Sequence, residues 1–256
     1  MVNVTYRKKG IRLQHIWFAD PNELSSHRSN ADLLFIHGST HIELPHAVLI
    51  GAQHTLIKQL NSNPDTVYQT FGKHLRKFIQ RSIGEGTTIQ ILTGKEISSE
   101  TLDICLRLYN KMKEDKGLPG VFNTNLAKKY ANCGNLLISL ARIEGSVVGF
   151  KASIIDKHNL RGWVSAFSFR ENQFDAQAVS RAHQLLEWET MQWCCKNGLL
   201  NYDFGGIYSF DQPNGIDKFK MAFAKDGLRV TYNNYLVGVS PLGKAAIICY
   251  NILKRK

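Results

Sequence analysis

The fold is decided by the stretch NYDFGGI at residues 201–207, together with GIDKFK at residues 215–220. The first stretch predicts a strand that ends in the two glycines Gly205 and Gly206, and the second predicts a short helix. Two successive glycines let the backbone turn sharply and let a ligand approach it closely. We therefore expect the glycine pair and Lys220 on the helix to face the same cavity.

A mixed sheet flanked by helices is predicted around this stretch. Three consecutive strand candidates form its centre, the first two are joined by a turn at residues 144–146, and a long helix follows them. The expected strands are 87–92, 136–143, 147–155, 160–169, 199–204 and 229–239. The expected helices are 99–116, 125–132, 175–197, 216–224 and 241–253. This order indicates an α/β protein with a mixed sheet.

The first part of the chain is expected to be a smaller subdomain. Asn63 and Pro64 predict the N-terminus of a single helix that ends near Ser82 and carries a basic face. We place the boundary between the halves near residue 95, which gives residues 1–95 and 96–256. Earlier strands are predicted at 11–18, 33–37 and 47–49, with turns at Asp20-Pro21 and His37-Gly38.

The composition is that of a globular protein with a strong positive charge. Hydrophobic residues make up 43% of 256 residues, and the formal net charge of +11 favours anionic partners such as phosphates, nucleotide-linked sugars, RNA or an acidic membrane surface. Basic residues are spread along the chain, with one cluster at residues 254–256, so no DNA-reading module is expected. The five cysteines form no CxxC pair. We predict a cytoplasmic protein without disulfides, signal peptide or membrane span.

Three segments resemble the FemAB family of peptidoglycan-bridge aminoacyltransferases, which belongs to the GNAT superfamily of N-acyltransferases. The most specific segment is the glycine pair followed by Phe219-Lys220, and the others are GKHLRKFI at residues 72–79 and the hairpin over residues 136–155. The resemblance runs in order over residues 70–240. It implies a GNAT fold in which the second half is a full catalytic domain and the first half is a short, degenerate GNAT-like subdomain.

The resemblance implies an acyltransferase that moves an acyl or aminoacyl group onto an amine of an envelope-type acceptor. Such an acceptor is an amino sugar or a peptidoglycan- or lipid-linked amine. The amine is expected to attack the activated carbonyl directly, without a covalent enzyme intermediate. Two alternatives stay open: a tRNA-dependent aminoacyltransferase of the peptidoglycan-bridge type, and a non-catalytic GNAT-like binding module.

Lys220, Asp203 and Tyr208 are the expected catalytic residues. The resemblance places Phe219-Lys220 beside the reacting carbonyl, where the positive charge of the lysine suits a developing oxyanion. Asp203 lies at the end of a strand, where ligand-facing groups collect in α/β sheets, and is a candidate general base. Tyr208 is a candidate proton donor to the leaving thiolate.

The expected substrate-binding residues surround the same stretch or lie on the flanking helices. Glu189 lies on the apolar stripe of the long helix. Its carboxylate must therefore be paired, be exposed at a cleft or have a raised pKa. The set comprises Gly205, Gly206, Phe219, Tyr202, Glu189 and Arg76.

No tightly bound cofactor and no metal is expected, since His37, His41 and His46 match no zinc spacing. The segment QFDAQA at residues 173–178 lacks the glycines with which standard GNAT enzymes hold the CoA pyrophosphate, and Asp175 is expected to cap the helix instead. The donor is left open between acyl-CoA, an acyl-carrier protein and aminoacyl-tRNA. The acceptor is expected to be a small or lipid-linked molecule, with at most peripheral membrane contact through the last helix and with no DNA partner.

Further polar groups of the long helix receive structural interpretations. His183 and Glu187 lie four residues apart and could serve as a base and its orienter, but we favour a simple surface pair. Cys194 and Cys195 are expected to be buried helix cysteines.

Overall fold

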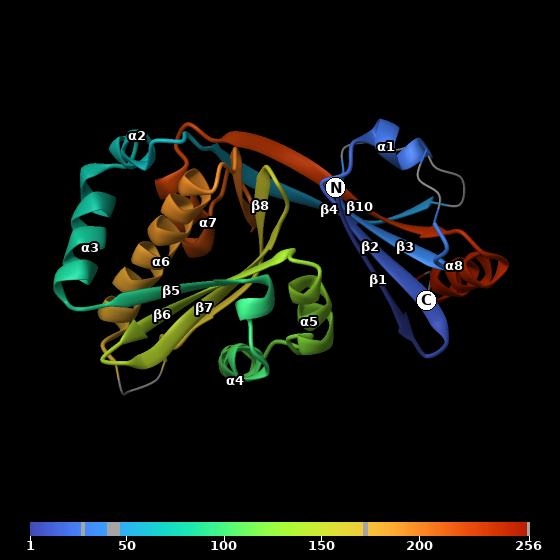
Figure 1. Cartoon of the computed structure of the whole chain (residues 1–256), viewed down its shortest axis with the longest axis horizontal. Helices are drawn as coiled ribbons and strands as arrows, with labels where there is room; N and C mark the ends of the chain where they lie inside the picture. Colours follow the sequence, from blue (N-terminus) through green and yellow to red (C-terminus); the bar gives the residue numbers. More distant parts are fainter. Residues whose placement is uncertain (27–28, 40–46, 171–173, 255–256) are drawn as a thin grey trace. The chain divides into compact units, whose positions relative to one another are not determined.

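The computed structural model describes residues 1–26, 29–39, 47–170 and 174–254. The chain divides into two compact units (Figure 1). Unit 1 comprises Met1–Thr55, Gly206–Gln212 and Arg229–Lys256, and unit 2 comprises Leu56–Gly205 and Pro213–Leu228.

The sheet of unit 2 has the strand order β4-β9-β8-β7-β6-β5. Neighbours from β5 to β8 are antiparallel, whereas β8 and β9 are parallel and share a register of three residue pairs. The strands are β4 (Ala47–Gln59), β5 (Thr88–Thr93), β6 (Leu136–Ile143), β7 (Ser146–Ile155), β8 (Asn159–Phe167) and β9 (Asn201–Ile207).

Helices cover both faces of this sheet. On one face, apolar residues of α6 such as Val179 and Leu186 pack on Ala141 and Val148 of the sheet. On the other face, Phe122 before α5 packs edge-on against Phe150 of β7. The helical segments are α2 (Pro64–Gln69), α3 (Lys73–Gly84), η1 (Gly94–Glu96), α4 (Ser99–Asp115), α5 (Thr124–Asn132), α6 (Ala176–Lys196) and α7 (Gly215–Phe223).

Side-chain caps fix where the main helices of unit 2 begin. The hydroxyl of Ser98 accepts the backbone N–H of Thr101 at the start of α4. Asp175 caps α6, as the sequence predicts. At α7, Asn214 and Asp217 form a capping box, which orients the helix that carries Lys220.

Unit 1 contains a second sheet region in the order β1-β2-β3-β10-β4. One of its faces packs on Leu24 of α1, and the other packs on Ile247 of α8. Its remaining elements are β1 (Val2–Lys8), β2 (Ile11–Trp17), α1 (Pro21–Ser26), β3 (Leu33–Ser39), β10 (Leu228–Gly238) and α8 (Pro241–Lys254). The last helix therefore docks on its own core, although Leu242, Ile248 and Ile252 stay exposed. In the ranges that the structure describes, no helix is both long and apolar enough to cross a bilayer.

The structure corrects several local predictions. The single helix expected from Pro64 to Ser82 is wrong, because α2 ends at Gln69 and Gly72 starts α3 with an extended backbone. The turn expected at His37-Gly38 lies inside β3, where His37 pairs with Trp17, and the register with β10 shifts around Gly38, whose φ is +65°. Gly205 and Gly206 lie inside β9 rather than after it.

The two compact units differ in their bounds from the halves 1–95 and 96–256. The segment from Leu56 to residue 95 belongs to unit 2, because β5 pairs with β6 and α3 packs on α6. Two hydrogen bonds from Arg181 to Glu85, at 2.7 and 2.8 Å, fasten the end of α3 to α6. The segment from Arg229 onward belongs to unit 1, because β10 pairs with β3.

Gly205→Ala is expected to destabilise the protein by roughly 2 kcal/mol or more, because φ is +72° and a β-carbon would lie 2.6 Å from the carbonyl oxygen of Gly162. Gly84→Ala is the matched control, since nothing lies within 4 Å of its added β-carbon and the residue is helical. Urea unfolding of both variants measures the difference. Equal midpoints would contradict the close backbone contact.

Candidate active site

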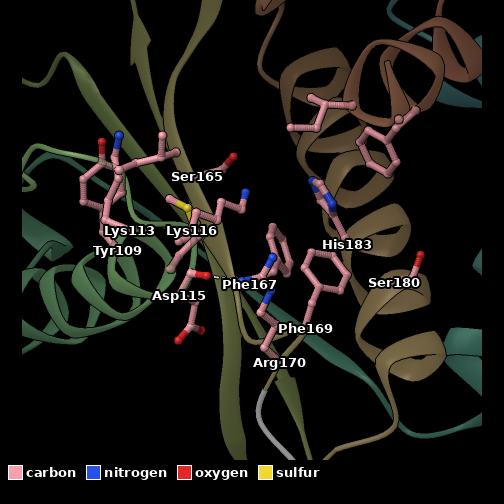
Figure 2. Close-up of a pocket in the computed structure, with 16 residues that line it drawn as sticks. Tyr109, Lys113, Asp115, Lys116, Ser165, Phe167, Phe169, Arg170, Ser180 and His183 are labelled. Carbon is pink, nitrogen blue, oxygen red and sulfur yellow. Dashed lines mark hydrogen bonds between the residues drawn. The ribbon is translucent and has the colours of Figure 1, made fainter. Parts of the chain in front are cut away.

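A cavity of about 520 Å³ lies in unit 2 and is the candidate active site. Its walls come from the end of α4, the end of β8, the first half of α6 and the first turn of α7 (Figure 2). Tyr109, Phe167 and Phe219 contribute aromatic surface, while Ser165 and His183 contribute polar atoms. A cavity of this size and mixture is typical of small-molecule sites.

His183 lies at the cavity wall and also reaches the protein interior. The ring centroids of Phe167 and Phe219 each lie 4.0 Å from that of the imidazole, at interplanar angles of 30° and 22°, so the imidazole is held between two aromatic rings. Burial lowers the pKa of His183 below 6.5, against the opposing effect of Glu187. The imidazole is therefore neutral at pH 7 and able to accept a proton.

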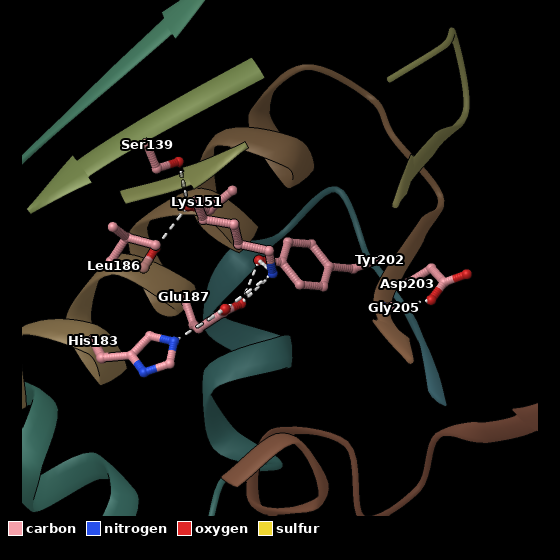
Figure 3. A network of polar contacts seen from close by, with 9 residues as sticks. Ser139, Lys151, His183, Leu186, Glu187, Tyr202, Asp203 and Gly205 are labelled. Atoms are coloured by element: carbon pink, nitrogen blue, oxygen red, sulfur yellow. Dashed lines mark hydrogen bonds and ion pairs between the residues drawn. The ribbon is translucent and has the colours of Figure 1, made fainter. Parts of the chain in front are cut away.

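A buried polar network continues inward from His183 (Figure 3). Nε2 of His183 lies 3.7 Å from Oε1 of Glu187. The ammonium of Lys151 donates to the two carboxylate oxygens of Glu187 at 2.9 and 2.7 Å, and to the Tyr202 hydroxyl at 2.9 Å. The Tyr202 hydroxyl in turn donates to Oε2 of Glu187 at 2.5 Å. All three inner groups are buried, so the network is shielded from water.

Helix periodicity and strand register bring these groups together. His183 and Glu187 lie four residues apart on α6 and so share one face. Lys151 lies in β7, where the neighbouring residues before and after it in sequence are buried. Tyr202 lies in β9 and is the register partner of Leu160 in β8. Burial of the apolar residues in these elements carries the polar groups inside, where they must pair with each other.

The groups of this network fix each other's protonation states. Burial alone would raise the pKa of Glu187, but the adjacent Lys151 ammonium and His183 outweigh it and lower this pKa below the ordinary value. Burial and the Glu187 carboxylate raise the pKa of Tyr202 well above 10.0, so the phenol keeps its proton and donates it. At pH 7 the Glu187 carboxylate, 3.7 Å from Nε2 of His183, favours the tautomer with its hydrogen on Nε2, which leaves the Nδ1 lone pair as the basic position.

The glycine-containing strand end is a point of close backbone contact. Gly205 has a φ of +72°, and the backbone of Gly162 lies too close to its Cα for any side chain larger than hydrogen. Asp203 holds this conformation, because its Oδ1 accepts the N–H of Gly205 at 2.8 Å and its Oδ2 lies 3.6 Å from the Arg161 guanidinium. The amide of Gly205 is therefore engaged by Asp203.

Lys220 on α7 is half-buried, and charged groups of the network and of the end of β9 shift its pKa. Burial, followed by the positive charge of Lys151, lowers the pKa of Lys220 to about 8. The carboxylates of Glu187, Asp203 and Asp217 act in the opposite direction. Lys220 is thus mainly cationic at pH 7 and loses its charge a short way above it.

Seven of the nine predicted site residues belong to unit 2, and five of these lie at the cavity, in the buried network or near the end of β9. Phe219 lines the cavity, and Tyr202 is part of the buried network. Lys220, Asp203 and Gly205 lie around the same strand end and the helix that follows it.

The other four predicted site residues, of which Glu189 and Arg76 also belong to unit 2, lie outside these groups, and the described lining of the cavity includes none of them. Gly206 and Tyr208 belong to unit 1, and the Tyr208 side chain is 79% exposed. Glu189 is half-buried on α6, and burial raises its pKa. Arg76 is half-buried on α3.

The sequence interpretation missed the centre of the network. The surface pair favoured for His183 and Glu187 is wrong, because Glu187 is only 3% exposed. Lys151 was not singled out, although a lysine within an otherwise apolar strand is a signal for a buried, paired charge. Cys194 and Cys195 are buried on α6, as expected.

The N-terminus of α6 is closed by its own cap. The carboxylate of Asp175 accepts the backbone N–H groups of Gln177 and Ala178, each at 3.1 Å. Gln173, in the segment singled out from the sequence, lies outside the described residues. Within the described ranges, no group of three or more histidines, cysteines or carboxylates is arranged to hold a metal ion. His41 and His46 lie outside those ranges.

The mixed sheet, the parallel β8–β9 pair and the adjoining cavity define the class of protein. The chain belongs to the GNAT acetyltransferase family: the model described as "Acetyltransferase (GNAT) domain" matches residues 70–221, which is more than half of the chain. This match includes the cavity, the buried network and Lys220.

Solved structures share the fold at low sequence identity. FemX matches with a TM-score of 0.61 and 12% identity, over 93% of this chain and 84% of FemX. The C-terminal domain (DUF2156) of a candidate lysylphosphatidylglycerol synthetase from Agrobacterium fabrum has a TM-score of 0.56 and 12% identity, over 98% of this chain and 85% of that one. A search of curated proteins found no match. The predicted FemAB-like GNAT fold with two parts is confirmed.

Glu187→Gln is expected to destabilise the protein by roughly 3–5 kcal/mol at pH 7, because Lys151 is left buried without its counter-charge. Glu189→Gln, two residues further on α6 and only half-buried, is the control and is expected to change stability by less than about 0.5 kcal/mol. Denaturant unfolding measures both.

The effect of Glu187→Gln should also depend on pH. Since the folded pKa of Glu187 is lowered, its contribution is present above the unfolded value of 4.5 and is lost as the pH falls through the folded pKa. The difference in unfolding free energy between wild type and Glu187→Gln should therefore become smaller as the pH falls. A gap that widens as the pH falls would contradict the ion pair.

Proposed function

We propose that this chain is an N-acyltransferase that moves an acyl or aminoacyl group onto an amine of an envelope-type acceptor. The observation that carries the proposal is a cavity with a neutral histidine at its wall, backed by a buried carboxylate, inside the segment that matches the GNAT family. That arrangement supplies a base where an amine must lose a proton.

The proposed reaction is a direct attack of the acceptor amine on the carbonyl carbon of a thioester or ester. The C–N bond forms, and the bond from the carbonyl carbon to sulfur or oxygen breaks. The attacking amine gives its proton to Nδ1 of His183, and the imidazolium returns this proton to the leaving group, which departs as the thiol or alcohol. Glu187 holds the other imidazole nitrogen and stabilises the imidazolium that forms. No covalent enzyme intermediate is needed.

Lys220 is proposed to stabilise the developing oxyanion, because its pKa of about 8 keeps it cationic at neutral pH in a half-buried position. Asp203 is proposed to be a positioning residue, since its carboxylate holds Gly205 and faces Arg161. Tyr208 belongs to unit 1, and its role as a donor to the leaving group stays a prediction.

The acceptor class is supported by charge and by the named similar proteins. The net charge of +11 favours acceptors carried on phosphate, such as nucleotide-linked or lipid-linked amines. FemX and a candidate lysylphosphatidylglycerol synthetase share the fold. The five cysteines are unbonded, which fits action in the cytoplasm.

The donor is proposed to be a dissociable acyl-CoA, acyl-carrier protein or aminoacyl-tRNA. At the start of α6, Asp175 occupies the amides of Gln177 and Ala178, so a donor phosphate would have to displace this carboxylate to bind there. This favours a donor whose recognition does not depend on that helix end.

A tRNA-dependent aminoacyltransferase is the second candidate, and the exposed basic side chains of α3 favour it. Lys73 and Lys77 lie one turn apart on its surface. This candidate requires binding of charged tRNA that weakens steeply with added salt. A non-catalytic binding module is less well supported, because the cavity beside His183 is open rather than filled.

His183→Asn is expected to lower kcat/KM for acyl transfer by roughly 10²–10⁴-fold, because the base is lost. His158→Asn, on an exposed loop of the same unit, is the control and should retain wild-type rates. The assay combines acetyl-CoA, longer acyl-CoAs, acyl-carrier protein or charged tRNA with amino-sugar acceptors, and product is measured by mass spectrometry. Full activity in His183→Asn would remove the histidine from the mechanism.

Lys220→Arg is expected to shift the alkaline limit of activity upward, because arginine stays charged where Lys220 loses its proton near pH 8. The ratio of the variant rate to the wild-type rate at each pH cancels the titration of the acceptor amine. This ratio should be constant below pH 7 and rise above pH 8. A flat ratio up to pH 10 would show that the charge of Lys220 is not used.

A further inference from the structure

Three basic side chains line the cavity in unit 2 at or beside the end of α4. Lys113 and Lys116 come from the end of α4, and Arg170 follows β8 (Figure 2). Lys116 and Arg170 are exposed and Lys113 is half-buried, so all three can meet a ligand that enters from solvent. Arg170 Nη1 donates to the backbone carbonyl of Asp115, which fixes it beside the end of α4.

The lining carboxylate does not cancel this charge. Asp115 lies 2.9 Å from the ammonium of Lys111, a residue that is not part of the lining. The pair is neutral as a whole, so Lys113, Lys116 and Arg170 leave that part of the cavity wall positive.

Large apolar side chains are exposed around the same opening. Leu118 is 49% exposed, Phe169 is 43% exposed and Ile216 is 58% exposed, and all three line the cavity. A group of exposed apolar side chains around a cavity is typical of a surface that a ligand covers. The ligand that suits this opening has an apolar or aromatic body.

His183 lies on the opposite side of the cavity from Lys113 and Lys116 (Figure 2). The site therefore offers three kinds of contact: cations at or beside the end of α4, exposed apolar side chains, and a base on α6. The Asp175 carboxylate already occupies two N-terminal amides of α6, whereas the end of α4 presents the lysine side chains of Lys113 and Lys116 to the cavity.

We propose that Lys113, Lys116 and Arg170 form an anion subsite for the acceptor, which carries a carboxylate or phosphate at the far end of an apolar or aromatic body from its reacting amine. This inference rests on the proposed function, because it treats His183 as the place where the amine reacts. It narrows the acceptor from any amine to an anionic, partly apolar one.

The test uses three matched amines: tyramine, tyramine O-phosphate and 4-(2-aminoethyl)benzoate. Their binding to the full chain is measured by calorimetry at fixed ionic strength. The two anionic probes are expected to bind about fivefold or more tightly than tyramine, because each exposed ion pair contributes modestly and several act together. A preference for the phosphate or for the carboxylate then tells which anion the subsite selects.

Variants locate the effect. The double variant Lys113→Gln/Lys116→Gln should lose the preference for anionic probes while it still binds tyramine. Lys128→Gln/Lys129→Gln makes the same change of charge on exposed residues of α5 and should keep the preference. Thermal unfolding confirms that both double variants are folded.

The subsite is overturned if none of the probes binds, if wild type shows no anionic preference, if the α4 variant retains the preference, or if the α5 variant loses it equally. Acyl transfer to the same amines is measured separately. Anionic preference without transfer from any donor would leave the subsite standing and defeat the proposed function. Acyl transfer at equal rates to the anionic amines and to tyramine would defeat the subsite and leave the proposed function standing.

Discussion

The ammonium of Lys151 is buried in the centre of unit 2, and its charge has to be neutralised where it lies. An unpaired charge in a protein interior costs several kcal/mol, so a folded chain must bring a carboxylate to it. Glu187 meets this need with both of its oxygens, and Tyr202 completes the set with one bond to each partner. The requirement fixes the rotation of α6 against the sheet, because Glu187 can reach Lys151 from only one face of its helix.

That rotation also decides where His183 lies. His183 precedes Glu187 by one helical turn, and its imidazole lies at the cavity wall between Phe167 and Phe219. Burial favours the neutral imidazole, while the Glu187 carboxylate, 3.7 Å from Nε2, favours the tautomer with its hydrogen on Nε2 and a basic Nδ1. A structural ion pair therefore also orients the candidate base of the cavity, and the positive charge of Lys151 itself helps to lower the pKa of His183.

Local signals in the sequence were enough for much of the fold. The hairpin of β6 and β7 and the cap at Asp175 depend on neighbouring residues, and both were predicted. The break between α2 and α3 was missed, because the basic residues after Gly72 continue a helical pattern across it. The network was missed for a different reason. Lys151 and Glu187 are 36 residues apart, and only the packing of β7 on α6 brings them together. Tyr202 and Phe219 were found through the family resemblance rather than through any contact that the sequence reveals.

Nuclear magnetic resonance of histidine labelled with ¹⁵N and ¹³C tests the central arrangement most directly, with the His183 signals assigned by their absence in His183→Asn. We predict a neutral imidazole at pH 7 that carries its hydrogen on Nε2 and titrates below 6.5. An imidazolium at pH 7, or a neutral ring with its hydrogen on Nδ1, would contradict the link from Lys151 through Glu187 to the cavity.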